Sequence, residues 1–172
     1  MYTAGSAVRW LADSGVLADP SALDAVGGTV PDAGGVIFVP ALAGLGAPHW
    51  APDARGVLSG LHLGTERGHL ARAVVEGIAA SVALLVSAAV LDLGRPLTSL
   101  RVDGGLTRSR LLVQAQADLL QVPVVVHRSA DATALGVAAL ARLGAGEAAS
   151  VGEAVGPAEA EAGLARLGLD SA

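Results

Sequence analysis

The sequence predicts an α/β domain in which short apolar strands alternate with helices. Compact apolar runs of three to five residues alternate with longer stretches whose apolar residues recur at helical spacing. Glycine or proline stands at most of the boundaries between them. Hydrophobic residues make up 52% of the 172 residues and aromatic residues only 2%, so Ala, Val and Leu must build the interior. Strands that alternate with helices pack as a layered α/β fold.

The first 35 residues are expected to hold one helix and one connection. Residues 6–17 have an amphipathic pattern that places Val8 and Leu11 on the apolar side of a short helix. The stretch 18–35 is rich in Asp, Pro and Gly, a composition typical of a surface connection. We therefore expect the chain to cross the surface before it enters the first strand.

A strand, a loop and a second strand are expected next. The apolar run 36–39 stops at Pro40 and predicts a buried strand. Glycines and prolines fill the segment 43–52, which indicates a fixed irregular loop, with Trp50 expected to pin it to the core. Residues 55–61 then have the composition of another short strand.

A long apolar helix is expected over 68–93, ended by Gly94. Its most hydrophobic part, residues 77–91, carries no charge and is closed by Glu76 and Asp92. About fifteen uncharged residues are too few to span a bilayer, which takes roughly 20. We therefore expect a buried helix here and no membrane span.

The second half of the chain repeats the alternation of strand and helix. Residues 100–102 and 122–126 are predicted strands, and residues 110–121 and 132–143 are predicted helices. The tail, 146–172, consists mainly of Ala, Gly and Glu with little pattern. The expected organisation is thus a folded domain over 1–145 and a weakly patterned tail over 146–172.

The best local candidate for a ligand site is the double-glycine bend after the strand at 100–102. A strand that ends in Gly104 and Gly105 and then enters a helix lets a ligand approach the backbone, because glycine has no Cβ atom. Thr107 or Ser109 is suited to capping that helix, and the hydroxyl of Ser109 is equally suited to a ligand. An ordinary turn is the alternative interpretation of this segment.

Composition excludes several classes of function. The formal charge of −5 disfavours a nucleic-acid partner, which needs a cationic face. All eleven basic residues are Arg, so the lysine of a Walker-type loop is absent, and the absence of Cys removes disulfides and thiolate ligands. The four His lack the spacing of a zinc helix, so no metal site is expected. The first residues do not have the pattern of a secretory signal.

Three linked motifs occur in order between residues 35 and 144. They are VPA, GLGAPHW and ARG (39–41, 44–50, 54–56); GVLSGL followed by HL and AVVE (56–61, 69–70, 73–76); and RVDGG followed by TALG (101–105, 133–136). Together with AGSAVRWL at 4–11, they resemble the C-terminal half of the glycerol kinase branch of the FGGY carbohydrate kinase family. The resemblance covers about residues 3–145 and implies an actin-like, ribonuclease H-like fold.

The resemblance implies that this half of the kinase binds the nucleotide. The implied binding residues are Gly5, Arg9, Gly104, Gly105 and Ser109. Two of them depart from the family, since Arg9 stands where these kinases usually have Gln, and Ser109 where they usually have Asn near the adenine. A guanidinium cannot accept a hydrogen bond as an amide does, and Ser109 is shorter than Asn.

The same resemblance implies transfer of a phosphoryl group from ATP to glycerol, with ADP and glycerol 3-phosphate as products. The catalytic Asp and the glycerol-binding residues are expected in an N-terminal lobe outside this chain, so we assign no catalytic residue and no metal ligand here. Mg²⁺ is expected on the phosphates and on that lobe. The implied setting is a cytoplasmic enzyme, with a homo-oligomer allowed for the full-length protein. The alternatives are a non-catalytic folded remnant that serves as an interaction module, or a lobe of another FGGY polyol or sugar kinase.

Overall fold

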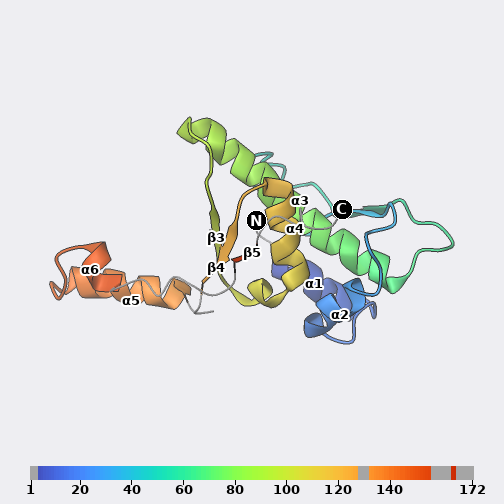
Figure 1. The fold of residues 1–172 in the computed structure, drawn as a ribbon, viewed down its shortest axis with the longest axis horizontal. Coiled ribbons are helices and arrows are strands. Elements are labelled where there is room, and N and C mark those ends of the chain that lie inside the picture. Colours follow the sequence, from blue (N-terminus) through green and yellow to red (C-terminus); the bar gives the residue numbers. More distant parts are fainter. Residues whose placement is uncertain (1–3, 128–131, 156–163, 166–172) are drawn as a thin grey trace.

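The computed structural model describes residues 4–127, 132–155 and 164–165. In chain order, its elements are α1 (Ala4–Asp13), η1 (Pro20–Ala22), α2 (Leu23–Gly27), β1 (Ile37–Val39), β2 (Val57–Ser59), α3 (Arg67–Leu93), β3 (Leu100–Val102), η2 (Gly105–Arg108), α4 (Arg110–Leu120), β4 (Val124–Val126), α5 (Ala132–Gly144), α6 (Val151–Val155) and β5 (Leu164–Ala165). Figure 1 shows the long helix α3 crossing the molecule, with α4 packed across it and the strands β3 and β4 beyond. The strands and helices alternate as predicted.

The N-terminal half of α3 forms the centre of the core. Val74, Val75 and Ile78 are at most 1% exposed and pack with apolar residues of α1, α2 and β1. A capping box between Glu66 and His69 starts the helix, and Gly94 ends it in the left-handed region with φ 63°. The predicted boundaries of this helix are confirmed to within one residue.

The C-terminal half of α3 leaves the core. Leu84, Leu91 and Leu93 are 52%, 82% and 63% exposed, so the expectation of a buried helix over residues 77–91 is correct only for the first part of that stretch. By length and composition alone, α3 is long and apolar enough to cross a membrane. We interpret it as a core helix because the side chains of its first half are buried among other elements of the chain.

The strands β1 and β2 form an antiparallel hairpin that packs against α3 through one face. Phe38 pairs with Leu58 in the register and is 4% exposed, and its ring stacks on Trp10 at a centroid distance of 5.7 Å. Ile37 and Val39 point to the other face and are 61% and 37% exposed. The predicted buried strand is therefore wrong in one respect: the hairpin buries only one of its two faces.

The strands β3, β4 and β5 form a second sheet in that order. The first two are parallel, with Leu100 opposite Val124 and Val102 opposite Val126, and β5 pairs antiparallel with β4. Val113 and Ala117 of α4 pack on this sheet to form a small second core. The parallel pair with α4 between its strands is the βαβ unit expected of an α/β fold.

The stretch 18–35 is more ordered than its composition suggested. It contains η1, which Asp19 caps through a 2.7 Å bond from the Ser21 backbone N–H, and the short helix α2. The guanidinium of Arg72 donates to the carbonyl oxygens of Gly27 at 2.8 Å and Val30 at 3.3 Å. These bonds fix α2 against α3, so the expectation of a plain surface connection is wrong.

The helices α5 and α6 pack on each other at one end of the molecule (Figure 1). Ala139 of α5 and Ala154 of α6 form a small buried cluster with Ala148 of the connection between them, and Arg142 donates to the carbonyl oxygen of Ala154 at 2.8 Å. Within the predicted tail, α6 and β5 are regular elements, whereas residues 156–163 and 166–172 lie outside the described part of the chain.

Candidate functional site

The double-glycine bend lies immediately after β3 and is open. Gly104 has φ 92° and ψ 173°, a conformation that residues with a side chain rarely adopt. The hydroxyl of Thr107 donates to the Gly104 carbonyl at 2.7 Å and closes the first turn of η2. A Cβ atom built on Gly104 or Gly105 meets nothing within 4 Å, so the space that a side chain would fill is available to a ligand.

The start of α1 lies beside this bend. α1 contacts η2, and a cavity of about 160 Å³ is lined both by Ala4 and by residues on either side of the glycine pair. Gly5 is exposed, and a Cβ atom built on it also meets nothing within 4 Å. Arg9 lies four residues later on the same helix and is exposed too, so both residues share one face of α1. The structure thus brings Gly5, Gly104 and Gly105 to one region with open backbone.

Ser109 differs from the other four residues because it is buried and fully engaged. It is 8% exposed and is the N-cap of α4, where its Oγ accepts from the Leu112 backbone N–H at 3.1 Å. Its hydroxyl donates in a short bond to Oδ1 of Asp24 on α2. The predicted capping of this helix by Ser109 is confirmed. Asp24 was not predicted from the sequence, because no sequence pattern links Asp24 to Ser109, 85 positions away.

The wall of the 160 Å³ cavity away from the glycines is apolar. Ile78 and Val82 of α3, Val102 of β3 and Val113 of α4 face it, together with the side chain of Gln116. Gln116 is 8% exposed, so this cavity is lined by one buried polar residue among apolar ones. Sequence reasoning missed Gln116, since a single glutamine in a helix carries no pattern.

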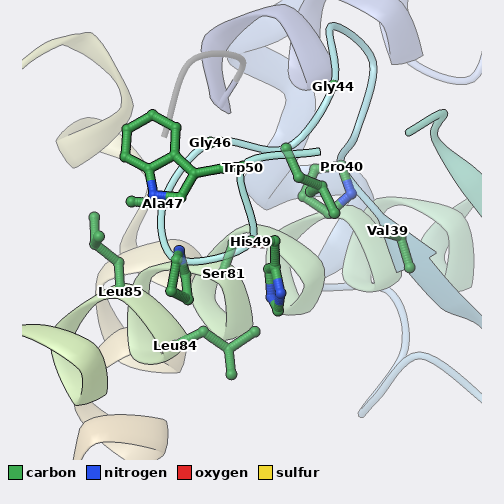
Figure 2. Close-up of a pocket in the computed structure, with 12 residues that line it drawn as sticks. Val39, Pro40, Gly44, Gly46, Ala47, His49, Trp50, Ser81, Leu84 and Leu85 are labelled. Atoms are coloured by element: carbon green, nitrogen blue, oxygen red, sulfur yellow. The ribbon is translucent and has the colours of Figure 1, made fainter. Parts of the chain in front are cut away.

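A larger hollow of about 300 Å³ lies between the loop 44–50 and α3. Figure 2 shows the loop arching over the helix, with His49 and Trp50 on the loop and Ser81, Leu84 and Leu85 below. Trp50 is 68% exposed, so the expectation that it pins the loop to the core is wrong. The loop instead closes on itself through paired backbone bonds of 2.8 and 2.9 Å between Leu45 and Ala51.

Acidic side chains in the described residues do not gather into a metal centre. No group of three or more His, Cys, Asp or Glu that could hold a metal ion occurs within residues 4–127, 132–155 and 164–165. Asp103 is the carboxylate beside the glycine bend, and it is exposed. A divalent ion at this site would therefore depend on ligands from elsewhere, such as phosphate oxygens.

Glu76 lies on α3 beside the hairpin and has a shifted pKa. Partial desolvation raises the pKa of this carboxyl above the ordinary 4.5, and the nearby charge of Arg72 opposes the rise. Asp32 adds to the rise through repulsion, whereas the backbone N–H of Ala33 counteracts it. The folded chain thus favours the protonated form of Glu76 more than the unfolded chain does.

Glu76→Gln is expected to stabilise the chain at neutral pH and to leave it unchanged at acidic pH. Because the folded-state pKa is the higher one, ionisation of Glu76 lowers stability as pH rises from 4.5 through the folded value. Below 4.5 the carboxyl is neutral in both states, and the amide resembles it. Thermal melts at pH 7 and pH 3.5 measure the difference. A melting temperature at pH 7 equal to that of the wild type contradicts the shift.

Comparison with known proteins assigns the family. The profile of the "FGGY family of carbohydrate kinases, C-terminal domain" matches residues 1–145. The chain belongs to the FGGY carbohydrate kinases. Glycerol kinases of Trichlorobacter lovleyi and Gloeobacter violaceus are 52% and 50% identical to it over 147 residues, which is 85% of this chain. The chain spans 30% of the length of these two relatives.

Solved structures of FGGY kinases share the fold of this chain. A Plasmodium falciparum glycerol kinase with ADP matches 94% of this chain and 32% of its own, with a TM-score of 0.80 and 35% identity. A ligand-bound xylulose kinase from Lactobacillus acidophilus matches 95% of this chain and 33% of its own, with a TM-score of 0.79 and 27% identity. The expected fold class and the resemblance to this family are confirmed, and this FGGY chain corresponds to the C-terminal domain.

Proposed function

We propose that this chain is the nucleotide-binding lobe of a glycerol kinase, which phosphorylates glycerol with ATP to give ADP and glycerol 3-phosphate. The observation that carries the proposal is the open backbone at Gly5, Gly104 and Gly105 on two adjoining elements. The identity of 52% to a glycerol kinase favours glycerol over the sugars of other family members. The proposal includes a cytoplasmic location and allows a homo-oligomer of the full-length enzyme.

The five candidate residues have different tasks in this proposal. Gly5, Gly104 and Gly105 let the nucleotide contact backbone that any Cβ atom would cover. Arg9 is exposed one helical turn beyond Gly5. Its guanidinium is suited to donate hydrogen bonds to the nucleotide and cannot accept them. Ser109 supports the bend from the buried side through its cap.

The described residues of this lobe have a geometry that suits nucleotide binding, but they supply no complete catalytic site. When bound, ATP supplies the phosphoryl group that is transferred, and Mg²⁺ would sit on its phosphates. Phosphoryl transfer needs a group that accepts the hydroxyl proton and walls that position both reactants. Asp103 is exposed and belongs to no cluster of three or more His, Cys, Asp or Glu in the described part of the chain. We therefore place the catalytic carboxylate and the glycerol site on the N-terminal lobe.

Uncovered apolar surface supports the need for a second lobe. β3 pairs with β4 on one edge, and no described strand occupies its other edge. Leu84, Leu91 and Leu93 of α3 are also exposed, and the apolar cavity lined by Val102 of β3 lies beside the middle of that helix. An open strand edge beside apolar side chains is suited to take up another part of the protein. We propose that the remainder of the kinase covers this surface.

Calorimetry with ADP and a coupled assay for glycerol phosphorylation test the proposal. We expect weak ADP binding that ATP competes away, and no glycerol 3-phosphate from this chain alone. A chimera in which this chain replaces the C-terminal part of the Trichlorobacter lovleyi relative is expected to phosphorylate glycerol. Flat heats with ADP favour the folded remnant instead, and turnover by this chain alone contradicts the placement of the carboxylate.

A further inference from the structure

Asp24 joins two distant helices of the chain beside the candidate nucleotide site, in a contact that the proposed function does not use. Its carboxylate reaches from α2 to the start of α4, where Oδ1 accepts the hydroxyl of Ser109. Oδ2 accepts the backbone N–H of Arg110 at 2.7 Å and that of Leu111 at 3.4 Å. One side chain thereby binds three donors at the start of α4, which follows the glycine bend after the short helix η2.

These bonds leave no free backbone donor at the start of α4. The first four backbone N–H groups of a helix lack partners within the helix. Here the Leu106 carbonyl takes that of Ser109 at 3.0 Å, Asp24 takes those of Arg110 and Leu111, and the Oγ of Ser109 takes that of Leu112. The Asp24 carboxylate also supplies the negative charge that a helix start attracts. A phosphate group therefore finds no free backbone N–H there and meets the Asp24 carboxylate, so only the exposed side chains of Arg108 and Arg110 remain to attract it.

The helix that carries Asp24 is held rigidly. Arg72 binds the carbonyl oxygens of Gly27 and Val30, just beyond Asp24. A Cβ atom built on Gly27 would lie 2.9 Å from Cδ1 of Leu111, so α2 and α4 are in close contact. Leu23, next to Asp24, is 3% exposed and belongs to the main core. Asp24 therefore holds the start of α4 at a fixed position relative to the main core, and with it the segment from Gly104 to Ser109.

We propose that Asp24 is a positioning and specificity-determining residue of the nucleotide site. Its carboxylate fixes Ser109 and the first turn of α4, and so sets the position of the glycine bend. By occupying the backbone donors of that helix start, it denies them to the phosphates and leaves the bend to the uncharged adenosine part of the nucleotide. The inference rests on the proposed function, since it concerns the same site.

Calorimetry with adenosine and pyrophosphate on Asp24→Ala and Asp24→Asn tests this role. Asp24→Ala is expected to weaken adenosine binding about tenfold and to strengthen pyrophosphate binding, because the helix start loses its carboxylate. Asp24→Asn keeps one acceptor oxygen and is expected to recover part of the adenosine affinity. Asp92→Asn, an exposed charge change at the end of α3, is the control and should match the wild type. A residue that only stabilises the fold would not shift the two ligands in opposite directions.

Hydrogen exchange at the backbone amides of Arg110 and Leu111 distinguishes a failure of the inference about Asp24 from a failure of the proposed nucleotide site. Faster exchange at these amides in Asp24→Ala, with the exchange of α3 amides unchanged, supports the inference that the Asp24 carboxylate fixes the start of α4. Unchanged exchange, or unchanged adenosine affinity in a variant that folds like the wild type, overturns the inference. If the wild-type chain binds neither ADP nor adenosine, the proposed function fails together with the ligand role of Asp24. The exchange rates then show whether Asp24 still holds the helix start.

Discussion

Replacing Gly77 with alanine is expected to lower the melting temperature of the chain by roughly 4–8 °C. Gly77 lies where α3 crosses β1, and a Cβ atom built on it would be 2.2 Å from the carbonyl oxygen of Phe38. That oxygen belongs to the backbone and cannot rotate away, so the helix and the hairpin must separate. Overpacking of this severity costs about 3 kcal/mol, which exceeds the gain of about 1 kcal/mol that alanine brings to a helix interior.

Gly136→Ala provides the matched control for this prediction. Gly136 lies in α5, and a Cβ atom built on it meets nothing within 4 Å. Its replacement therefore tests helix propensity without the contact, and we expect the melting temperature to stay the same or rise. Thermal melts followed by circular dichroism measure both variants. A Gly77→Ala chain that melts at or above the wild-type temperature contradicts the close packing of α3 on β1.

Gly105→Val is expected to weaken ADP binding at least about tenfold, equivalent to about 1.4 kcal/mol, without unfolding the chain. The backbone at Gly105 is exposed, and a Cβ atom there contacts no other part of the protein. The branched side chain would instead fill the space through which a nucleotide approaches the bend. Binding is therefore expected to fall while the melting temperature stays close to that of the wild type. Calorimetric titration with ADP, paired with a thermal melt, measures both quantities.

Gly152→Val is the control for the nucleotide variant. Gly152 is an exposed glycine of α6, the helix that packs on α5. The same substitution there is expected to leave ADP affinity unchanged. Equal affinities for Gly105→Val and the wild type would show that the nucleotide does not approach the glycine bend.

The regular elements could be predicted because each has a local signal. The boundaries of α3 follow from helical spacing and from Gly94, and β3, α4 and β4 follow from the alternation of apolar runs with a helical stretch. The glycine bend was also visible, since two adjacent glycines after a strand are a local feature. Its position beside Gly5 follows from the contact of α1 with η2, which only the fold reveals.

Features that depend on distant contacts could not be predicted. α2 was missed because its five residues lie among Asp, Pro and Gly, and its stability comes from Arg72, more than 40 residues away. The engagement of Ser109 with Asp24 likewise joins two distant helices. Trp50 was misjudged since large aromatic residues are usually buried, whereas this loop is held by its own backbone bonds. The exposed half of α3 has the apolar composition of a core helix. Composition does not show which half of such a helix is buried by other elements.

The most direct measurement of the central claim is an amide chemical-shift map of the isotope-labelled chain titrated with ADP. If the start of α1 and the glycine bend form one wall of the nucleotide site, the largest shifts will fall on Gly5, Arg9, Gly104 and Gly105. Amides of α5 and α6 should change little. Shifts that concentrate instead on the loop 44–50, with none at the two glycine segments, would contradict the assignment of this site.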